Sequence, residues 1–286
     1  MKIKIVASDS MGVRSLATIF ECGGVKIAID PGIALSPKRF GLPPHKKELE
    51  KFRILRNKLF EEVSDCEFIF ISHYHHDHFV PFYKKDYVVS GFSFAEKIYT
   101  GKKVFLKSPY ENMNYNQKQR GKKLIKEFKK REVSFEILEC EIGENYPIDF
   151  YSVLTHGGSK ERGSVGVVGF VCGREKFLYC SDCQFMDENV CEMALQFKPD
   201  VLLSSGPPIY LENFREEDEK KSISIIKRVS PHVGNLILDH HLIRSKDYEK
   251  FLENLSLKNI FTSSSFMGLN DEPLERERKE NYFKKR

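Results

Sequence analysis

The chain has 286 residues, with 41% hydrophobic and 30% charged side chains and a formal net charge of +5 at pH 7. Its apolar content can form the core of one large α/β domain or two small ones, and its apolar runs are too short to span a bilayer. Residues 1–6 alternate like a strand and lack the apolar segment of a signal peptide, so we expect a cytoplasmic protein with no membrane partner. The pI near 8.6 allows anionic substrates without requiring nucleic acid.

The seven cysteines are odd in number and scattered along the chain. That pattern is not typical of a disulfide framework, so we expect free thiols. Cys180 and Cys183 form a C-x-x-C pair, but no second pair accompanies them. We therefore do not expect a zinc knuckle.

The N-terminal segments predict a strand followed by a hairpin. A strand is expected at residues 2–7, and the polar loop at residues 8–14 is typical of a plain connector. Residues 15–21 and 25–30 alternate around a Cys-Gly-Gly turn, which predicts the hairpin.

The hairpin ends in Asp30, which precedes a Pro-Gly pair. An ordinary Asx turn would explain this residue from local sequence alone. After a Pro/Gly-rich loop, residues 46–63 repeat apolar side chains at helical spacing among charges. This spacing predicts an amphipathic helix that covers one face of a sheet.

The densest group of ligand-type side chains follows a buried strand expected at residues 68–72. Within six residues the chain places His73, His75, His76, Asp77 and His78. Alternate side chains of an extended segment point the same way, so His73 and His75 can face one metal. A tight turn would swing Asp77 and His78 toward a second point and leave His76 turned away. Imidazoles and a carboxylate suit zinc or another first-row divalent ion.

The alternative is a chance His-rich turn on the surface. A buried strand delivers the cluster, however, and imidazoles this close would repel one another if they were protonated. A bound metal would hold them neutral, so we favour the metal site.

Residues 117–131 predict a strongly basic helix with eight cations, namely Lys118, Arg120, Lys122, Lys123, Lys126, Lys129, Lys130 and Arg131. These cations could bind phosphates. Only Phe128 interrupts the charges, and no stacking platform is apparent in the sequence. We therefore favour a solvated helix face over a nucleic-acid surface.

Three further strands of the second half end in ligand-type residues. The strand expected at residues 148–154 leads to His156, which precedes two glycines and is weak evidence alone. A hairpin strand at residues 176–180 leads to Asp182, which could merely cap a helix. A buried strand at residues 235–239 leads to His240 and His241, followed by Arg244. Either histidine could be a satisfied core residue, and the choice between them stays open at this point.

The remaining elements complete an α/β pattern. The other strands are expected at residues 104–107, 134–138, 166–172 and 200–205, and the other helices at residues 216–229 and 245–255. The charged tail at residues 270–286 is either a surface helix or a frayed end. Because no linker, repeat or low-complexity segment interrupts the chain, we expect a single domain over residues 1–286.

The pattern His-x-His-x-Asp-His at residues 73–78, after a hydrophobic strand, resembles the signature of the metallo-β-lactamase superfamily. The rest of that family's order is matched by Asp30, His156, Asp182 and His240, each at a strand end. The resemblance extends from residue 30 to residue 244 and implies an α/β fold, an αββα sandwich. With residues 7–15 and 238–244 added, the chain is similar to an archaeal-type group of these hydrolases, so the loop at residues 8–14 could border the site after all.

The resemblance also implies roles for the ligands. His73, His75 and His156 would hold one metal, Asp77, His78 and His240 the other, and Asp182 would bridge them. Asp30 would orient the His-rich loop. A strand-end His followed four residues later by Arg resembles the ribonuclease Z-like branch, which favours His240 with Arg244.

Two divalent cations about 3.5–4 Å apart can share a hydroxide of lowered pKa, with Asp77 and Asp182 as the catalytic carboxylates. Zinc is favoured, with manganese and iron as alternatives. Such a hydroxide would hydrolyse an ester-type substrate, and we favour a phosphodiester over a thioester, lactone or amide. The expected partner is a small-molecule or nucleotide-like substrate, with RNA as an alternative, while the oligomeric state stays open.

Other classes of protein compete with this interpretation. A flavodiiron-type oxidoreductase typically has Glu where this chain has His75, and no flavin-binding extension is evident. A ribonuclease Z-like RNA processor is the runner-up, supported by Arg244 and mild basicity but lacking a Gly/Pro-rich arm. A non-catalytic, metal-stabilised binding module is the third, although the complete ligand set argues against it. Lys160, Arg162 and Arg174 are further candidates for anion contact, and ordinary surface charge is favoured for each.

Overall fold

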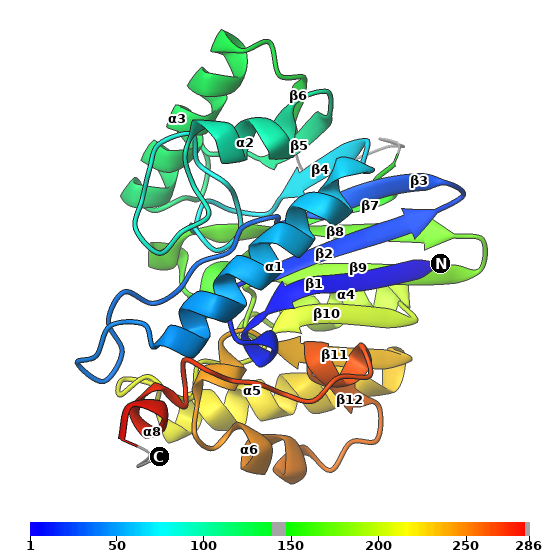
Figure 1. The fold of residues 1–286 in the computed structure, drawn as a ribbon. Helices are drawn as coiled ribbons and strands as arrows, with labels where there is room; N and C mark the ends of the chain where they lie inside the picture. The colour runs from blue at the N-terminus through cyan, green and yellow to red at the C-terminus, as the bar shows by residue number, and fades with distance from the viewer. Residues whose placement is uncertain (139–146, 284–286) are drawn as a thin grey trace.

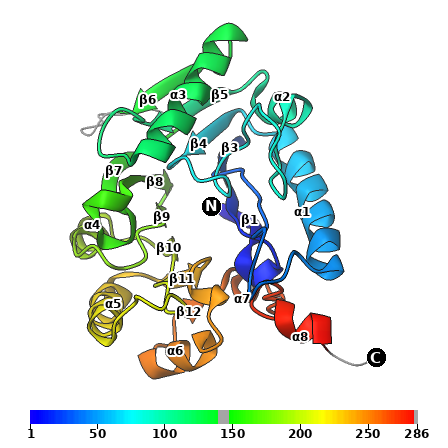
Figure 2. The ribbon, with the colours of Figure 1, turned by 90° about the vertical axis from the view of Figure 1, so that its left-hand side faces the viewer.

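The computed structural model describes residues 1–138 and 147–283, and it consists of two sheets packed face to face with helices on the outside (Figures 1 and 2). The first sheet contains, in spatial order, β1 (Lys2–Ser8), β2 (Leu16–Cys22), β3 (Val25–Ile29), β4 (Phe68–Ile71), β5 (Lys103–Lys107) and β6 (Phe135–Leu138). The second contains, in spatial order, β12 (Ile260–Phe261), β11 (Asn235–Asp239), β10 (Val201–Ser205), β9 (Glu175–Ser181), β8 (Ser164–Cys172) and β7 (Phe150–Thr155).

The two sheets repeat one plan. In each sheet the first three strands along the chain pair antiparallel, and the later strands add in parallel. Parallel neighbours need crossover connections, which the helices supply. No repeat was apparent in the sequence, because the two halves have the same pattern of strand pairing but different residues.

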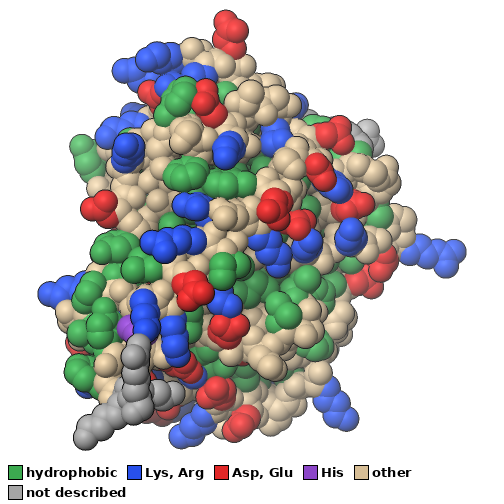
Figure 3. Space-filling model, in the orientation of Figure 1, with side chains coloured by type: hydrophobic (Ala, Val, Ile, Leu, Met, Phe, Trp, Pro, Cys, Tyr) green, Lys and Arg blue, Asp and Glu red, His purple; other side chains and the backbone are tan. Residues whose placement is uncertain are grey.

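Helices cover the outer faces of both sheets, as Figure 2 shows from the side. On the first sheet these are α1 (Lys46–Ser64), α2 (Phe92–Tyr99) and α3 (Tyr115–Lys130). On the second they are α4 (Asn189–Phe197), α5 (Glu216–Val229) and α6 (Tyr248–Leu255). The short helices α7 (Ser263–Phe266) and α8 (Arg278–Phe283) follow, and Lys and Arg side chains gather at the upper left of the surface, where α3 lies (Figure 3).

The core lies between the sheets. Phe20 of β2 stacks on Phe170 of β8 with ring centroids 4.5 Å apart, and Phe177 of β9 stacks on both rings. All three side chains are buried. Aromatic side chains from both sheets therefore interdigitate and hold the layers in register.

Every strand and helix predicted from the sequence is confirmed within the described residues, with small shifts of the ends. The α/β fold with an αββα arrangement is confirmed as well. The short helices α2 and α4 were not predicted. None of the helices in the described chain combines the length and hydrophobicity that a bilayer-spanning segment requires.

One expectation, that of free thiols, needs correction. Cys22 and Cys172 form a disulfide that joins β2 to β8, so these cysteines are not free thiols; the free thiols in the described chain are Cys66, Cys180, Cys183 and Cys191. The pairing depends on strands far apart in sequence, with Cα atoms 5.7 Å apart, so spacing along the chain could not show it.

The charged tail is anchored over its described part. Arg278 of α8 is fully buried, and its guanidinium donates two hydrogen bonds, of 2.7 and 2.8 Å, to the carboxylate of Glu48 in α1. It also donates to the carbonyl oxygens of Ser36 and Leu42. The tail therefore holds the loop that follows β3 against α1, through a buried bidentate pair.

A candidate metal centre between the two sheets

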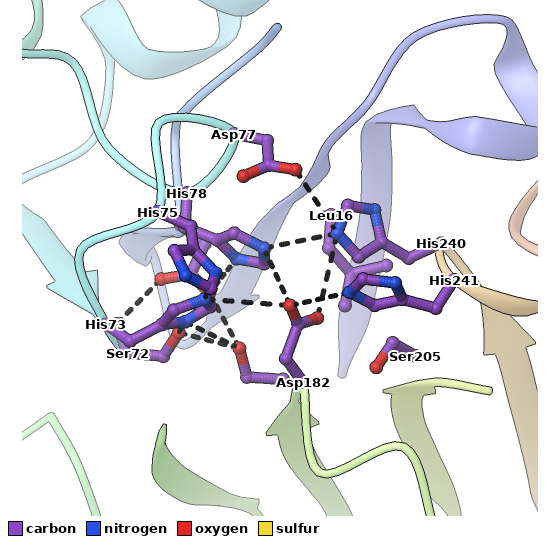
Figure 4. A network of polar contacts seen from close by, with 12 residues as sticks. Leu16, Ser72, His73, His75, Asp77, His78, Asp182, Ser205, His240 and His241 are labelled. Carbon is purple, nitrogen blue, oxygen red and sulfur yellow. Dashed lines mark hydrogen bonds and ion pairs between the residues drawn. The ribbon is translucent and has the colours of Figure 1, made fainter. Parts of the chain in front are cut away.

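Segments remote in sequence meet at one edge of the sheets, where β4, β7, β9 and β11 end (Figure 4). Residues 73–78 follow β4, His156 follows β7, Asp182 follows β9 and His240 follows β11. Polar side chains gather at this edge because backbone pairing holds the strand ends together while the side chains after them are free to point inward.

The structure brings together all seven side chains that the sequence predicted as ligands. The ligand atoms of one group lie within 4.8 Å of one another and belong to His73, His75, His156 and Asp182. A second group with the same spacing consists of Asp77, His78 and His240. These are the two sets that the resemblance implied, and Asp182 lies between them.

The carboxylate of Asp182 is the centre of the cluster. Its Oδ2 lies 3.4 Å from Nε2 of His156 and 3.6 Å from Nε2 of both His73 and His78. Its Oδ1 lies 3.7 Å from Nε2 of His240. These separations are long for hydrogen bonds, and they match ligand atoms that share a cation with metal–ligand distances of about 2 Å.

Three imidazoles are held from behind, through Nδ1. Nδ1 of His240 lies 2.6 Å from a carboxylate oxygen of Asp9, and Nδ1 of His78 lies 2.8 Å from one of Asp30. Nδ1 of His73 lies 2.9 Å from the hydroxyl of Ser72. A carboxylate behind a histidine holds the proton on Nδ1 and leaves Nε2 with its lone pair facing inward, as a metal ligand requires.

Asp30 anchors the His-rich loop, as expected. Its Oδ1 accepts from the backbone N–H of Ser72 at 2.7 Å, and its Oδ2 accepts from the hydroxyl of Tyr179 at 2.7 Å. Burial and the Asp30 carboxylate raise the pKa of Tyr179 well above its usual range, so this hydroxyl remains a donor. The first sheet is thereby tied to the second directly beneath the ligands.

Burial and charge set the protonation states of the cluster. Burial, with the neighbouring imidazoles, holds the pKa values of His73 and His75 well below the usual range. Burial works to raise the pKa of Asp182, but His240 and His78 outweigh it and hold that pKa well below its usual value. Neutral imidazoles around an ionised carboxylate are the forms that bind a divalent cation.

Several buried polar atoms of the cluster lack, in the described part of the chain, a hydrogen-bond partner that a bound cation would replace. Both ring nitrogens of His156 and Oδ1 of Asp182 are buried without a hydrogen-bond partner among the described residues. Burial works to lower the pKa of His78, but the carboxylates of Asp182 and Asp30 outweigh it and raise that pKa well above its usual value. Buried polar groups in proteins are nearly always satisfied, so the donor set fits a divalent cation.

Asp9 was missed in the interpretation from sequence. The loop at residues 8–14 is not a plain connector, because Asp9 is buried and contacts both His240 and Arg244. Burial works to raise the pKa of Asp9, but Arg244 and His240 outweigh it and lower that pKa to about 2. The only sequence signal was the similarity of residues 7–15 to the archaeal-type group.

Arg244 is not a free anion contact. Its guanidinium is buried and donates to Asp9 at 2.8 Å, while another of its nitrogens lies 3.5 Å from the carboxylate of Asp77. Of the other candidates, Lys160 and Arg162 lie in a short 3-10 helix (Lys160–Arg162), and Arg174 lies in the turn between β8 and β9. None of these three lines the cleft described next.

The two neighbouring histidines take different places. His240 is fully buried and belongs to the group with Asp77 and His78. His241 is not a core histidine either, because its Nε2 lies 3.2 Å from Asp182 and its ring borders the cleft. Burial and Arg244 lower the pKa of His241 to about 3. His76 is turned away as predicted, with Nε2 2.8 Å from the hydroxyl of Tyr83.

A cleft of about 620 Å³ opens above the cluster. His75, Asp77 and His241 form part of its wall, so the centre is reachable from outside. The cations that line it are Arg14, Lys85, Arg120 and Arg244, and the acids are Asp77 and Asp86. Because Asp77 belongs to the ligand set, the balance of charge at the mouth is positive.

The fold and the site define an α/β protein with an αββα arrangement, of the kind the resemblance implied, and a candidate His/Asp metal centre. Among solved structures, Zn²⁺-bound PqqB from Methylobacterium extorquens has a similar fold, with a TM-score of 0.52 and 9% identity over 92% of this chain and 98% of that one. No family model matches the sequence.

Relatives of known sequence identify the family. The UPF0282 protein of Thermococcus gammatolerans is 36% identical over 290 residues, covering 100% of this chain and 96% of that protein. The UPF0282 protein of Thermococcus sibiricus is 38% identical and covers 98% of this chain and 93% of that protein. The chain belongs to the UPF0282 family, which confirms the similarity to an archaeal group.

Proposed function

We propose that this protein is a metal-dependent hydrolase of an anionic ester-type substrate, with a phosphodiester favoured. The observation that carries the proposal is the position of Asp182, whose carboxylate lies within 3.7 Å of nitrogens from both groups of histidines. A carboxylate so placed can bridge two cations. A cleft directly above it leaves room for a substrate.

Each side chain has a definite task in this proposal. One cation would be held by His73, His75 and His156, the other by Asp77, His78 and His240, with Asp182 shared. Divalent cations at these positions, with zinc favoured, would supply Lewis acidity and lower the pKa of water. Asp9 and Asp30 keep His240 and His78 in the tautomer that presents Nε2 inward.

The cations at the mouth of the cleft favour an anionic substrate. Arg14 is fixed by two hydrogen bonds of 2.6 Å to Glu275, so it is a rigid part of the wall. Lys85 is exposed, and Arg120 is held by a hydrogen bond of 3.2 Å to the carbonyl oxygen of Tyr74. These cations would attract a phosphoryl or carboxyl group and orient it over the centre.

Metal analysis combined with a substrate panel tests the proposal. His75→Ala and Asp182→Ala are expected to lose turnover and metal content together, because each removes a shared or inward-facing ligand. Elemental analysis by mass spectrometry gives the metal content. Hydrolysis of bis(p-nitrophenyl) phosphate, a thioester, a lactone and an amide gives the activity. The matched control is His232→Ala, since His232 is an exposed histidine outside the cluster.

The outcomes separate the candidate functions. Full activity in either ligand variant would remove the assignment. Full metal occupancy without turnover on any substrate would favour the metal-stabilised binding module. Cleavage of structured RNA alone would favour the ribonuclease Z-like alternative.

A further inference from the structure

A second hollow, of about 460 Å³, lies beside the cleft against α3. Its aromatic walls are formed by Phe79, Phe82, Tyr83 and Phe92, which come from the segment after the His-rich loop and from α2. Phe92 is 48% exposed and Tyr83 is 38% exposed, so both offer ring surface to a ligand. Large exposed aromatic side chains grouped around a hollow are typical of a binding site.

The rim of this hollow is cationic. Arg120, Lys123, Lys126 and Arg131 line it, against a single acid, Glu127. Glu127 pairs with Arg131, and among the described residues neither Lys123 nor Lys126 has an acidic partner. The guanidinium of Arg131 lies over the rings of Phe82 and Phe92, 4.6 and 4.9 Å from their centroids. Cations and aromatic rings thus form the walls of the hollow together.

The hollow and the metal-centre cleft lie next to each other. Arg120 lines both of them. His76 borders the cleft, bonds to Tyr83 at 2.8 Å and stacks on Phe79. Arg120 and the contacts of His76 therefore mark the boundary that the two spaces share.

We propose that this hollow binds a nucleobase and its adjoining phosphate from a single-stranded oligonucleotide, while a neighbouring phosphodiester lies at the metal centre. The inference rests on the proposed function and names its substrate class. Bases stack on exposed aromatic rings, and Lys and Arg contact the backbone between them. A base inside a duplex has no free face to insert into a hollow, so a single strand is required.

This inference differs from the prediction that α3 presents only a solvated face. Phe128 of α3 is buried, and the aromatic side chains that line the hollow do not belong to this helix. The stacking platform comes instead from α2 and from residues 79–83, which the fold places beside α3. No property of α3 alone could reveal it.

Binding of an octamer of deoxyadenosine with phosphorothioate linkages, which resist hydrolysis, tests the proposal by fluorescence anisotropy. Tyr83→Ala and Phe92→Ala are each expected to weaken binding about tenfold, since a stacked base is lost. An abasic octamer with the same backbone is expected to bind both variants and the wild-type protein equally. Because both side chains are exposed, the variants should fold, and thermal unfolding checks this.

The charge contribution is tested on the same helix. Lys123→Gln and Lys126→Gln are expected to weaken binding of both octamers and to reduce the slope of log K against log salt by about 0.7 for each phosphate contact removed. Lys129→Gln is the matched control, because Lys129 is an exposed lysine of α3 that does not line the hollow. Phe283→Ala is the aromatic control, at an exposed phenylalanine of α8.

The result separates this inference from the proposed function. Equal affinity of the wild-type protein for the two octamers, or unchanged affinity in Tyr83→Ala and Phe92→Ala, would overturn the base-binding hollow even if the wild-type protein hydrolyses bis(p-nitrophenyl) phosphate. Loss of octamer affinity in those variants, without hydrolysis of any ester by the wild-type protein, would support the hollow and reject the proposed function. Tighter binding of a phosphorylated peptide than of the octamer would also overturn the inference.

Discussion

Single residues behind the ligands decide what the cluster can bind. Asp9, Asp30 and Ser72 each engage Nδ1 of one histidine, at 2.6, 2.8 and 2.9 Å. None of the three belongs to the predicted ligand set. They convert imidazoles, which exchange between two tautomers in water, into ligands that present one defined nitrogen to the metal.

We predict that Asp9→Ala lowers the affinity for divalent cations about 10- to 100-fold, because His240 loses the acceptor that fixes its tautomer. Competition with a chromogenic chelator measures this affinity. Asp9→Asn keeps an oxygen acceptor for Nδ1 of His240 and is expected to recover part of it. Both variants leave the guanidinium of Arg244 without the carboxylate of Asp9, so unfolding must be measured in parallel.

Asp86→Ala is the matched control, since Asp86 is an exposed acid that borders the same cleft. If Asp9→Ala binds the cation as tightly as the wild-type protein, Asp9 serves only the fold. A drop in stability equal in both Asp9 variants, with no difference in metal affinity between them, would lead to the same conclusion.

At the scale of the elements, several strands that lead to the site end in a left-handed backbone conformation. Asp30, Ser181 and His240 have φ values of 46°, 44° and 53°, and each follows or ends a strand. Residues other than glycine rarely adopt this conformation, and such strain is concentrated at functional sites. The turns direct the side chains that follow β3, β9 and β11 into the space between the sheets.

In the loop after β3, the backbone of Gly32 packs so closely against the His-rich loop that no side chain would fit there. A Cβ atom added to Gly32 would lie 2.5 Å from the backbone nitrogen of His78. We predict that Gly32→Ala displaces that loop and reduces metal content to below about a tenth of the wild-type value, in line with the loss caused by misplaced ligands. Elemental analysis of the purified variant measures it.

Gly23→Asn is the matched control for this substitution. Gly23 has a φ of 59° in the turn between β2 and β3, and a Cβ there meets no atom within 4 Å. Asn before Gly suits such a turn, so this variant should retain its metal. Normal metal content in Gly32→Ala would show that the His-rich loop can shift without losing its ligands.

The sequence predicted those strands and helices whose apolar residues repeat at a clear spacing. It also predicted the ligand residues that directly follow such strands. The strands before His73, Asp182 and His240 are apolar runs with a polar stop, and that local contrast located the ligands. The helix α2 and the partners of Asp9 were missed for a different reason. They depend on which surfaces meet after folding, and eight residues of α2 are too few to show a clear helical period.

At the scale of the whole molecule, the two sheets are fixed at both ends. At one end they share the candidate metal centre and the bond from Tyr179 to Asp30. At the opposite end, Cys22 at the end of β2 is joined to Cys172 at the end of β8. The first sheet contributes one cysteine and the second sheet the other, so the cross-link connects the layers themselves.

We predict that Cys22→Ser lowers the free energy of unfolding by about 2–5 kcal/mol, because the cross-link no longer restricts the unfolded chain. The two cysteines are 150 residues apart, so the restricted loop is long. Metal affinity should stay unchanged, since the disulfide lies at the end of the sheets away from the ligands. Guanidinium unfolding without reductant measures the stability.

Reductant supplies the control for this prediction. It should destabilise the wild-type protein by the same amount and leave Cys22→Ser unaffected. Alkylation of the unfolded wild-type protein, followed by mass spectrometry, should leave Cys22 and Cys172 unmodified until reductant is added. If both cysteines are alkylated without reductant, the pair is not cross-linked in solution, and the layers are held together by non-covalent contacts such as the aromatic core and the bonds around Asp30.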